Sequence, residues 1–263
     1  MLFYWQKAYD LDPNLAEANL AMGWVHFNRE DHDGAFPFFS RAIELDKDSA
    51  EVNFHVGAFL RSLGLYEQAR RHYAQALNLE PVPGDFATWH QVLADCDSQL
   101  GNAREAADLL GTAMGVNVDA NVTLDFAVCL LKLKEPGEAE KQIQEARRQG
   151  ADPARISRYE ALFSAAAGKR DAALALIRKE TNPSHPLVTA IYALLGMKDR
   201  AIQGITGALG EKGFRKFRWY PYSYLPLKNN PFFDSLRTDP RFESILANEK
   251  VRYDERTRKF GGL

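Results

Sequence analysis

The sequence is poor in the features on which several classes of protein depend. Only two of its 263 residues are cysteines, Cys96 and Cys129. They form no C-x-x-C pair, which excludes a disulfide framework, and both are expected to be buried thiols. No stretch approaches the roughly 20 apolar residues that a membrane-spanning helix needs. The start, MLFYWQKAYDLDP, turns polar too early to supply the hydrophobic part of a secretory signal. These absences predict a cytoplasmic protein without membrane contact.

The motifs of the common catalytic sites are also missing. The six histidines never form H-E-x-x-H, and without C-x-x-C there is no spacing for a structural zinc site. Neither the nucleophile elbow G-x-S-x-G nor the phosphate-binding G-x-x-x-x-G-K-[ST] and G-x-G-x-x-G patterns occur. We therefore predict a protein that is not an enzyme, with no catalytic residues, no metal ligands and no cofactor.

What the sequence does contain is an ordinary globular composition with an uneven charge. Hydrophobic residues make up 46% of the chain and charged residues 26%, enough apolar material to build a core. The formal net charge of −2 hides an acidic first part, residues 1–210, and a basic last part, residues 211–263. The last fifty residues are therefore expected to be a distinct piece.

A repeat of 34 residues organises most of the chain. Residues 16–49 align with residues 50–83 without a gap, and a third copy, 87–120, follows a three-residue insertion. Further copies begin near residues 120 and 154, and a shortened one begins near 185. A fixed period of this length predicts stacked supersecondary units rather than a single globular core.

Small residues occupy equivalent columns in these copies. Two helices approach most closely where their side chains are small, so these columns predict the crossing point of a helical hairpin. Large apolar residues recur around the columns at helical spacing, and no period-2 strand competes. The fold class is therefore all-α. The two columns are Ala35, Ala69, Ala106, Ala139, Ala173 and Ala201, and Gly23, Gly57, Ala94, Ala127 and Ala161.

The repeat resembles the tetratricopeptide repeat family over roughly residues 1–212. The resemblance implies a right-handed superhelix of helix pairs, whose first helices line a concave groove for a peptide or partner protein. The start of the chain, residues 1–15, aligns with the end of a repeat, with Ala8 in an alanine column and Pro13 in the position of Pro81. Either Met1 is an internal start of a longer array, or this half repeat is an N-terminal cap. Its apolar face could also pair two copies of the chain.

The family's groove positions can be carried over to the first three repeats. They are apolar and aromatic in the first two copies and polar in the third. Trp24, Phe27 and Phe54 would form an aromatic anchor of the kind that dominates protein interfaces; alternatively, they pack against a missing upstream repeat or the superhelix interior. The candidate binding residues are Leu20, Trp24, Phe27, Asn28, Phe54, His55, Arg61, Gln91 and Asp95.

Members of the family that bind chaperone tails grip a carboxylate with Lys and Asn at two of these positions. This chain has Leu20 and Trp24 there in its first repeat, and Gln91 and Asp95 in its third. The donors of a charge-assisted carboxylate grip are therefore missing, which excludes a receptor of that type.

The C-terminal piece, residues 213–263, begins with aromatic residues interleaved with Arg215, Lys216 and Arg218. Such a segment can bind single-stranded nucleic acid, but it can equally cover the last hairpin, which we favour. Residues 230–246 then resemble the closing element of bacterial repeat proteins with regulatory roles. There Asp239 and Pro240 are expected to cap and start a last helix.

Taken together, the sequence predicts a scaffold or adaptor that binds a partner protein or peptide in its concave groove. Two alternatives stay open. The chain could be the sensory part of a larger regulatory protein with its effector domain upstream, or residues 213–228 could bind nucleic acid.

Overall fold

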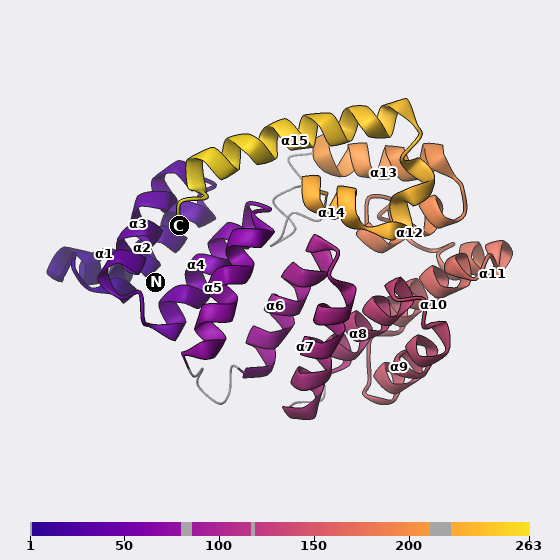
Figure 1. Cartoon of the computed structure of the whole chain (residues 1–263), viewed down its shortest axis with the longest axis horizontal. Helices are drawn as coiled ribbons and strands as arrows, with labels where there is room; N and C mark the ends of the chain where they lie inside the picture. Colours follow the sequence, from indigo (N-terminus) through magenta and orange to yellow (C-terminus); the bar gives the residue numbers. More distant parts are fainter. Residues whose placement is uncertain (1, 80–85, 117–118, 211–221) are drawn as a thin grey trace.

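The computed structural model describes residues 2–79, 86–116, 119–210 and 222–263, and every regular element in these ranges is a helix. A single helix, α1 (Leu2–Leu11), precedes a series of antiparallel hairpins that stack into an arc (Figure 1). The hairpins are α2 (Ala16–Asn28) with α3 (His32–Leu45), α4 (Ala50–Ser62) with α5 (Tyr66–Asn78), α6 (Phe86–Leu100) with α7 (Ala103–Val116), α8 (Ala120–Lys132) with α9 (Pro136–Arg148), α10 (Pro153–Ala166) with α11 (Arg170–Leu176), and α12 (Pro186–Leu194) with α13 (Lys198–Gly210).

The helices begin where side-chain oxygens or prolines favour a first turn. Ser49 accepts a hydrogen bond from the backbone N–H of Val52 and caps α4. Asp152 caps α10, whose first residue is Pro153. Side chains also cap α8 and α12, whereas Leu15 gives α2 no such cap, so local capping helps to fix the start of most of these hairpins.

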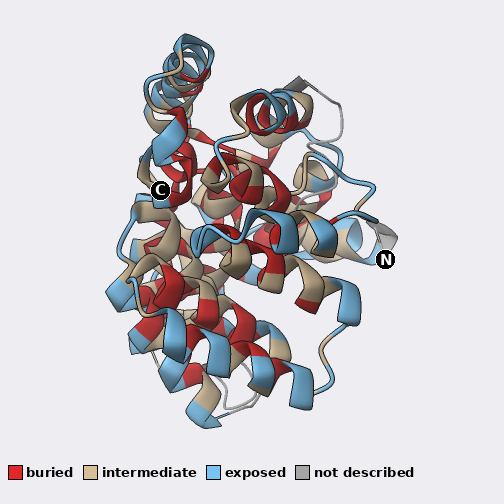
Figure 2. Cartoon of the chain, turned by 90° about the vertical axis from the view of Figure 1, so that its right-hand side faces the viewer, coloured by how far each residue is buried: buried red, intermediate tan, exposed pale blue. Residues whose placement is uncertain are grey.

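The small-residue columns lie at the helix crossings. The six alanines of the first column are all fully buried. A Cβ atom added at Gly23 would lie 2.9 Å from the ring of Phe39, and one added at Gly57 would lie 3.1 Å from the ring of Tyr73. The predicted close approach is confirmed. Figure 2 shows the consequence, with buried residues between the helices and exposed residues along the outer turns.

Both cysteines are free and buried, as predicted. Cys96 lies in the core cluster of the first repeats and Cys129 in the cluster formed by α6, α7 and α8. Burial raises the pKa of both thiols above their usual range. They are therefore packing residues rather than reactive thiols.

The C-terminal segment returns to the first repeats instead of ending on the last hairpin. After α14 (Tyr224–Asn229) and the short 3₁₀ helix η2 (Pro231–Leu236), the long helix α15 (Pro240–Phe260) crosses from the region of α13 to α3 and α4 (Figure 1). Asp239 caps α15 and Pro240 is its first residue, which confirms that part of the prediction. The sequence did not predict the return to the start of the array.

Side-chain contacts hold α15 along the edge where the helices of each hairpin are joined. Phe260 is buried, with its ring centroid 5.4 Å from that of Phe36 and 6.1 Å from that of Phe59. Arg256 donates a hydrogen bond to the carbonyl oxygen of Leu63, in the turn between α4 and α5. Near α6, the amide of Asn229 donates to the carbonyl oxygen of Gln99. We call residues 222–263 the clasp, because they connect the last hairpins to the first.

Helix α1 packs on the first hairpin through one face only. Tyr9 makes an edge-to-face contact with Phe38, at 5.4 Å between ring centroids, whereas Tyr4 and Leu11 are more than 70% exposed. No helix among the described residues has the length and apolar character to span a bilayer.

Candidate functional site

The predicted aromatic residues of the first two repeats pack on one another. Trp24 lies edge-on to Phe27, and its indole N–H donates to Nδ1 of His55 at 3.3 Å. Phe54 stacks on Trp89 of the next repeat, with ring centroids 4.9 Å apart. Trp89 is buried, and the other four side chains, Trp24, Phe27, Phe54 and His55, are half-buried. Most of their surface is therefore committed to repeat-to-repeat packing, and their role as partner anchors stays a prediction.

Two other predicted residues of these repeats lie apart from this cluster. Leu20 is buried in the core of the first repeats, whereas Asn28 is exposed at the end of α2. Neither lines the cleft described in the next paragraph.

The remaining three predicted residues, Arg61, Gln91 and Asp95, line a cleft of about 590 Å³ on the inner side of the arc. Most of its walls come from the first helices of the third to sixth hairpins, α6, α8, α10 and α12, and from the start of the clasp; Arg61 of α4 and Leu110 of α7 also line it. The clefts that bind small molecules or peptide side chains in proteins typically measure about 300–1,000 Å³. This cleft is therefore the candidate functional site.

Hydrogen bonds between residues 34 positions apart build the floor of the cleft. Arg61 donates to Asp95 at 2.9 Å, and the amide of Gln91 donates to Asp125 at 3.1 Å. The hydroxyl of Tyr159 donates to the other oxygen of Asp125 at 3.4 Å. Each bond joins a first helix to its counterpart in the next repeat. The repeat in the sequence thus becomes a polar ladder that fixes the spacing of the inner helices.

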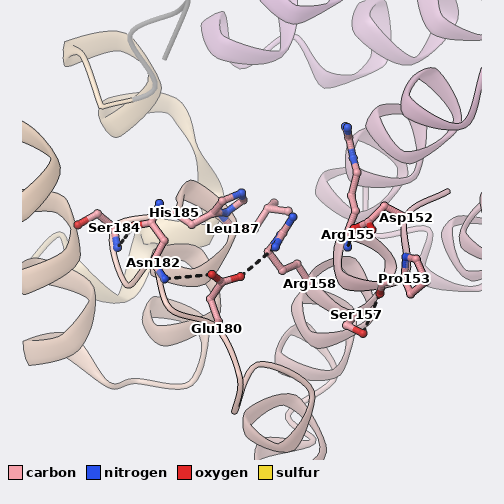
Figure 3. A network of polar contacts seen from close by, with 10 residues as sticks. All are labelled: Asp152, Pro153, Arg155, Ser157, Arg158, Glu180, Asn182, Ser184, His185 and Leu187. Carbon is pink, nitrogen blue, oxygen red and sulfur yellow. Dashed lines mark hydrogen bonds and ion pairs between the residues drawn. The ribbon is translucent and has the colours of Figure 1, made fainter. Parts of the chain in front are cut away.

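Basic side chains line one part of the cleft. Lys132, at the end of α8, donates to the hydroxyl of Ser98 at 2.7 Å, and partial burial lowers its pKa. Arg158 of α10 forms an ion pair with Glu180 at 2.9 Å. In Figure 3, Arg158 points to Glu180, whereas the side chain of Arg155 extends away from that pair.

His185 stands at the start of α12 and also lines the cleft. Its Nδ1 accepts the backbone N–H of Leu187 at 3.2 Å, which places the ring proton on Nε2. Burial lowers the pKa of His185 to about 4, and the charges of Arg158 and Arg155 add to the effect. The ring is therefore a neutral hydrogen-bond donor at physiological pH.

The clasp closes one side of the cleft. The hydroxyl of Tyr222 donates to the carbonyl oxygen of Ser184 at 2.7 Å and shares a 2.8 Å hydrogen bond with Thr189. Phe232 and Phe233 of η2 are buried and complete the apolar part of the wall. The cleft thus has a polar floor and one apolar wall.

The pKa of Asp125 offers a test of this geometry. Burial raises its pKa from 3.8 to about 6, against hydrogen bonds that act in the opposite direction. The folded protein therefore binds a proton that the unfolded chain releases, and stability rises as the pH falls through 6. Between pH 7.5 and pH 5, we expect the wild type to gain about 1 kcal/mol relative to Asp125→Asn. Urea titrations of both proteins at the two pH values measure their free energies of unfolding. If the difference between the two proteins did not change with pH, the burial of the Asp125 carboxylate would be contradicted.

The described residues contain no group of three or more His, Cys, Asp or Glu side chains arranged to hold a metal ion. The basic part of the proposed nucleic-acid segment, including Arg215, Lys216 and Arg218, lies outside the described residues. Of the residues that follow, Tyr222 is buried against α12 and Tyr224 packs on Tyr253 of α15 at 5.7 Å. These two rings therefore pack against helices of the same chain.

Sequence reasoning missed the residues that complete the cleft. Groove positions were carried over only to the first three repeats. Extending the same positions to the fourth and fifth repeats would have found five of them, whereas His185 begins the shortened sixth copy and Tyr222 of the clasp had no signal in the repeat. The missed residues are Asp125, Lys132, Arg155, Arg158, Tyr159, His185 and Tyr222.

Comparison with protein-family models identifies two copies of a tetratricopeptide repeat, at residues 16–49 and 50–83. These are the two copies that align without a gap. No curated protein matches the chain.

Solved structures share the fold. PilF of Pseudomonas aeruginosa matches with a TM-score of 0.59 and 21% identity, over 72% of this chain and 86% of its own. PilW, a type IV pilus biogenesis factor, matches with a TM-score of 0.60 and 18% identity, over 71% and 87% of the two chains. A tetratricopeptide repeat protein from Parabacteroides merdae matches with a TM-score of 0.58 and 14% identity, over 89% and 98%. At these identities, the likeness concerns the all-α superhelix alone.

Proposed function

Because this chain carries tetratricopeptide repeats and folds as an all-α superhelix, we propose that it is a non-catalytic scaffold that binds a partner peptide in its concave cleft. The observation that carries the proposal is the cleft itself. It lies on the inner side of the arc, its floor is fixed by the polar ladder, and it has both polar and apolar walls. A preformed site of this kind binds with little loss of conformational entropy.

The partner proposed is a peptide segment of another protein rather than a small metabolite. The lining residues come from four successive first helices and the clasp, which makes the site long as well as deep. Pilus biogenesis is the named role of PilW. For this chain, the likeness supports no more than a role in assembling other proteins. A cytoplasmic location and a regulatory role with an upstream effector rest on the sequence and stay predictions.

Filling the cleft tests the proposal. Val128 lines its middle, on α8, and Val128→Trp would place an indole where the peptide must lie. We expect this variant to retain peptides from a random 12-residue display library at least about tenfold less well than the wild type, a loss of about 1.4 kcal/mol. Because Val128 also packs against the core clusters beside α8, helical circular dichroism and the urea midpoint are measured alongside, and binding is compared only if both show that the variant is folded.

Val251→Trp is the matched control, because Val251 is 57% exposed on α15. It should retain peptides as the wild type does. Equal retention by the wild type and Val128→Trp would contradict the assignment of the cleft. If no peptide were enriched on any of the three proteins, the proposed function itself would fail.

A further inference from the structure

Several charges that line the cleft are neutralised within the protein. Asp95 is paired with Arg61, and also accepts the amide of Gln99 at 3.1 Å. Arg158 is paired with Glu180 outside the cleft. These side chains have little net charge to offer a partner, because their fields cancel at short range.

Two cations, Lys132 and Arg155, stand outside these ion pairs. Within the described part of the chain, no carboxylate lies within 4 Å of the guanidinium of Arg155 or the ammonium of Lys132. Lys132 donates to the hydroxyl and the carbonyl oxygen of Ser98, and Arg155 lies over the ring of Tyr159, 5.9 Å from its centroid. Asp125 carries the opposite charge and attracts Arg155, although its hydrogen bonds come from the neutral groups of Gln91 and Tyr159. The cleft therefore presents more positive than negative charge.

The two cations stand at opposite ends of the inner helices. The bond from Gln91 to Asp125 joins α6 to α8, and the bond from Tyr159 to Asp125 joins α8 to α10. Both have an offset of 34 residues, so these first helices run parallel and in register. Arg155 is then level with Asn121, eleven residues before Lys132 on α8. At 1.5 Å per residue, the backbones of the two residues are offset by roughly 16 Å along the helix axes, and the spacing between α8 and α10 adds to this.

That separation decides between ligand classes. One small anion cannot contact both cations, whereas an extended peptide, at about 3.3 Å per residue, covers the distance in about five residues. The positions that grip a carboxylate in the family hold Leu20, Trp24, Gln91 and Asp95 in the first and third repeats. None of these side chains is a cation, so we do not expect these positions to bind the C-terminal carboxylate of a peptide.

We infer that the cleft selects acidic peptide segments, in which two Asp or Glu side chains about five residues apart pair with Lys132 and Arg155. The inference rests on the proposed function, because it names the chemistry of the peptide that the cleft takes. Apolar residues between the two acids would face Val128, Leu187 and the wall formed by Phe232 and Phe233.

The test begins with the same random 12-residue library, panned against the full chain. Peptides enriched on the wild type should contain paired Asp or Glu residues four to six positions apart. One selected peptide is then synthesised with a fluorescent label, together with its isostere in which Gln and Asn replace Glu and Asp. The isostere should bind at least about tenfold more weakly, since each charge-assisted bond is lost.

Charge variants of the protein locate the contacts. Lys132→Gln and Arg155→Gln should each weaken binding of the acidic peptide about tenfold, and neither should change binding of the isostere. Lys132→Arg keeps the charge and should restore most of the affinity, which a merely structural role of Lys132 would not explain. Lys141→Gln and Arg148→Gln are the matched controls, because both side chains are more than 70% exposed on α9.

The two proposals fail in different ways. Peptides that bind the cleft but show no acidic enrichment, or an isostere that binds as well as the acidic peptide, would overturn the inference and leave peptide binding standing. Enriched peptides that are insensitive to Val128→Trp would instead show that the cleft is not the binding site and would overturn both.

Discussion

Replacing Phe260 with alanine is expected to lower the free energy of unfolding by about 3 kcal/mol, although the residue lies near the end of the chain. Its ring is buried between Phe36 of the first hairpin and Phe59 of the second. The substitution removes these contacts and leaves a cavity at the point where the clasp meets the first repeats. We therefore expect a lower urea midpoint and earlier proteolysis within α15.

Val251→Ala provides the control on the same helix. Val251 is exposed, so its substitution should change the free energy of unfolding by less than about 0.5 kcal/mol. Equal effects of the two variants would mean that α15 does not hold the ends of the superhelix together in solution.

The second large effect is expected at the other end of the clasp. Tyr222 is fully buried, and its hydroxyl is bonded to Ser184 and Thr189 at the start of α12. Tyr222→Ala removes both hydrogen bonds and most of a large buried ring, which should cost about 3–5 kcal/mol. Tyr222→Phe keeps the ring and should cost about 1–2 kcal/mol, because the buried partners lose a hydrogen bond.

The pair of variants separates packing from hydrogen bonding. Urea titration followed by circular dichroism gives both free energies, and peptide binding gives the effect on the cleft that Tyr222 lines. We expect Tyr222→Ala to weaken peptide binding and Tyr222→Phe to leave it nearly unchanged. Full stability of Tyr222→Ala would contradict the docking of the clasp on α12.

The repeat architecture could be predicted from the sequence because its determinants are local. The alanine columns and the Asp152-Pro153 pair each act within one hairpin or between neighbours, so a period of 34 residues carries them directly. The burial of Cys96 and Cys129 followed from the same register.

The clasp could not be predicted in the same way. Whether α15 meets the first hairpins depends on the curvature of the whole array, which accumulates from small rotations between repeats. The contact between Arg256 and Leu63 spans 193 residues and has no counterpart in any repeat. A closing element was predicted at residues 230–246, but not the surface on which its helix lies.

The binding residues were predicted only in part, for a related reason. Aromatic side chains such as Trp24 and Phe54 suggest anchors, but in the structure they pack on neighbouring rings. The proposed contacts in the cleft come instead from Lys132 and Arg155, which form no ion pair, whereas Arg61 and Arg158 are paired with Asp95 and Glu180. That balance is a property of side-chain geometry, which the spacing of residues does not reveal.

The central claim is that a peptide binds in the concave cleft, and methyl NMR of the full chain tests it most directly. Val92, Val128 and Leu187 line the cleft on three different helices, whereas Ile43 and Leu77 belong to outer helices of the first two hairpins. On addition of a selected acidic peptide, we predict chemical-shift changes at the first three residues and none at the other two. Changes confined to Ile43 and Leu77, with the cleft methyls unmoved, would contradict the account.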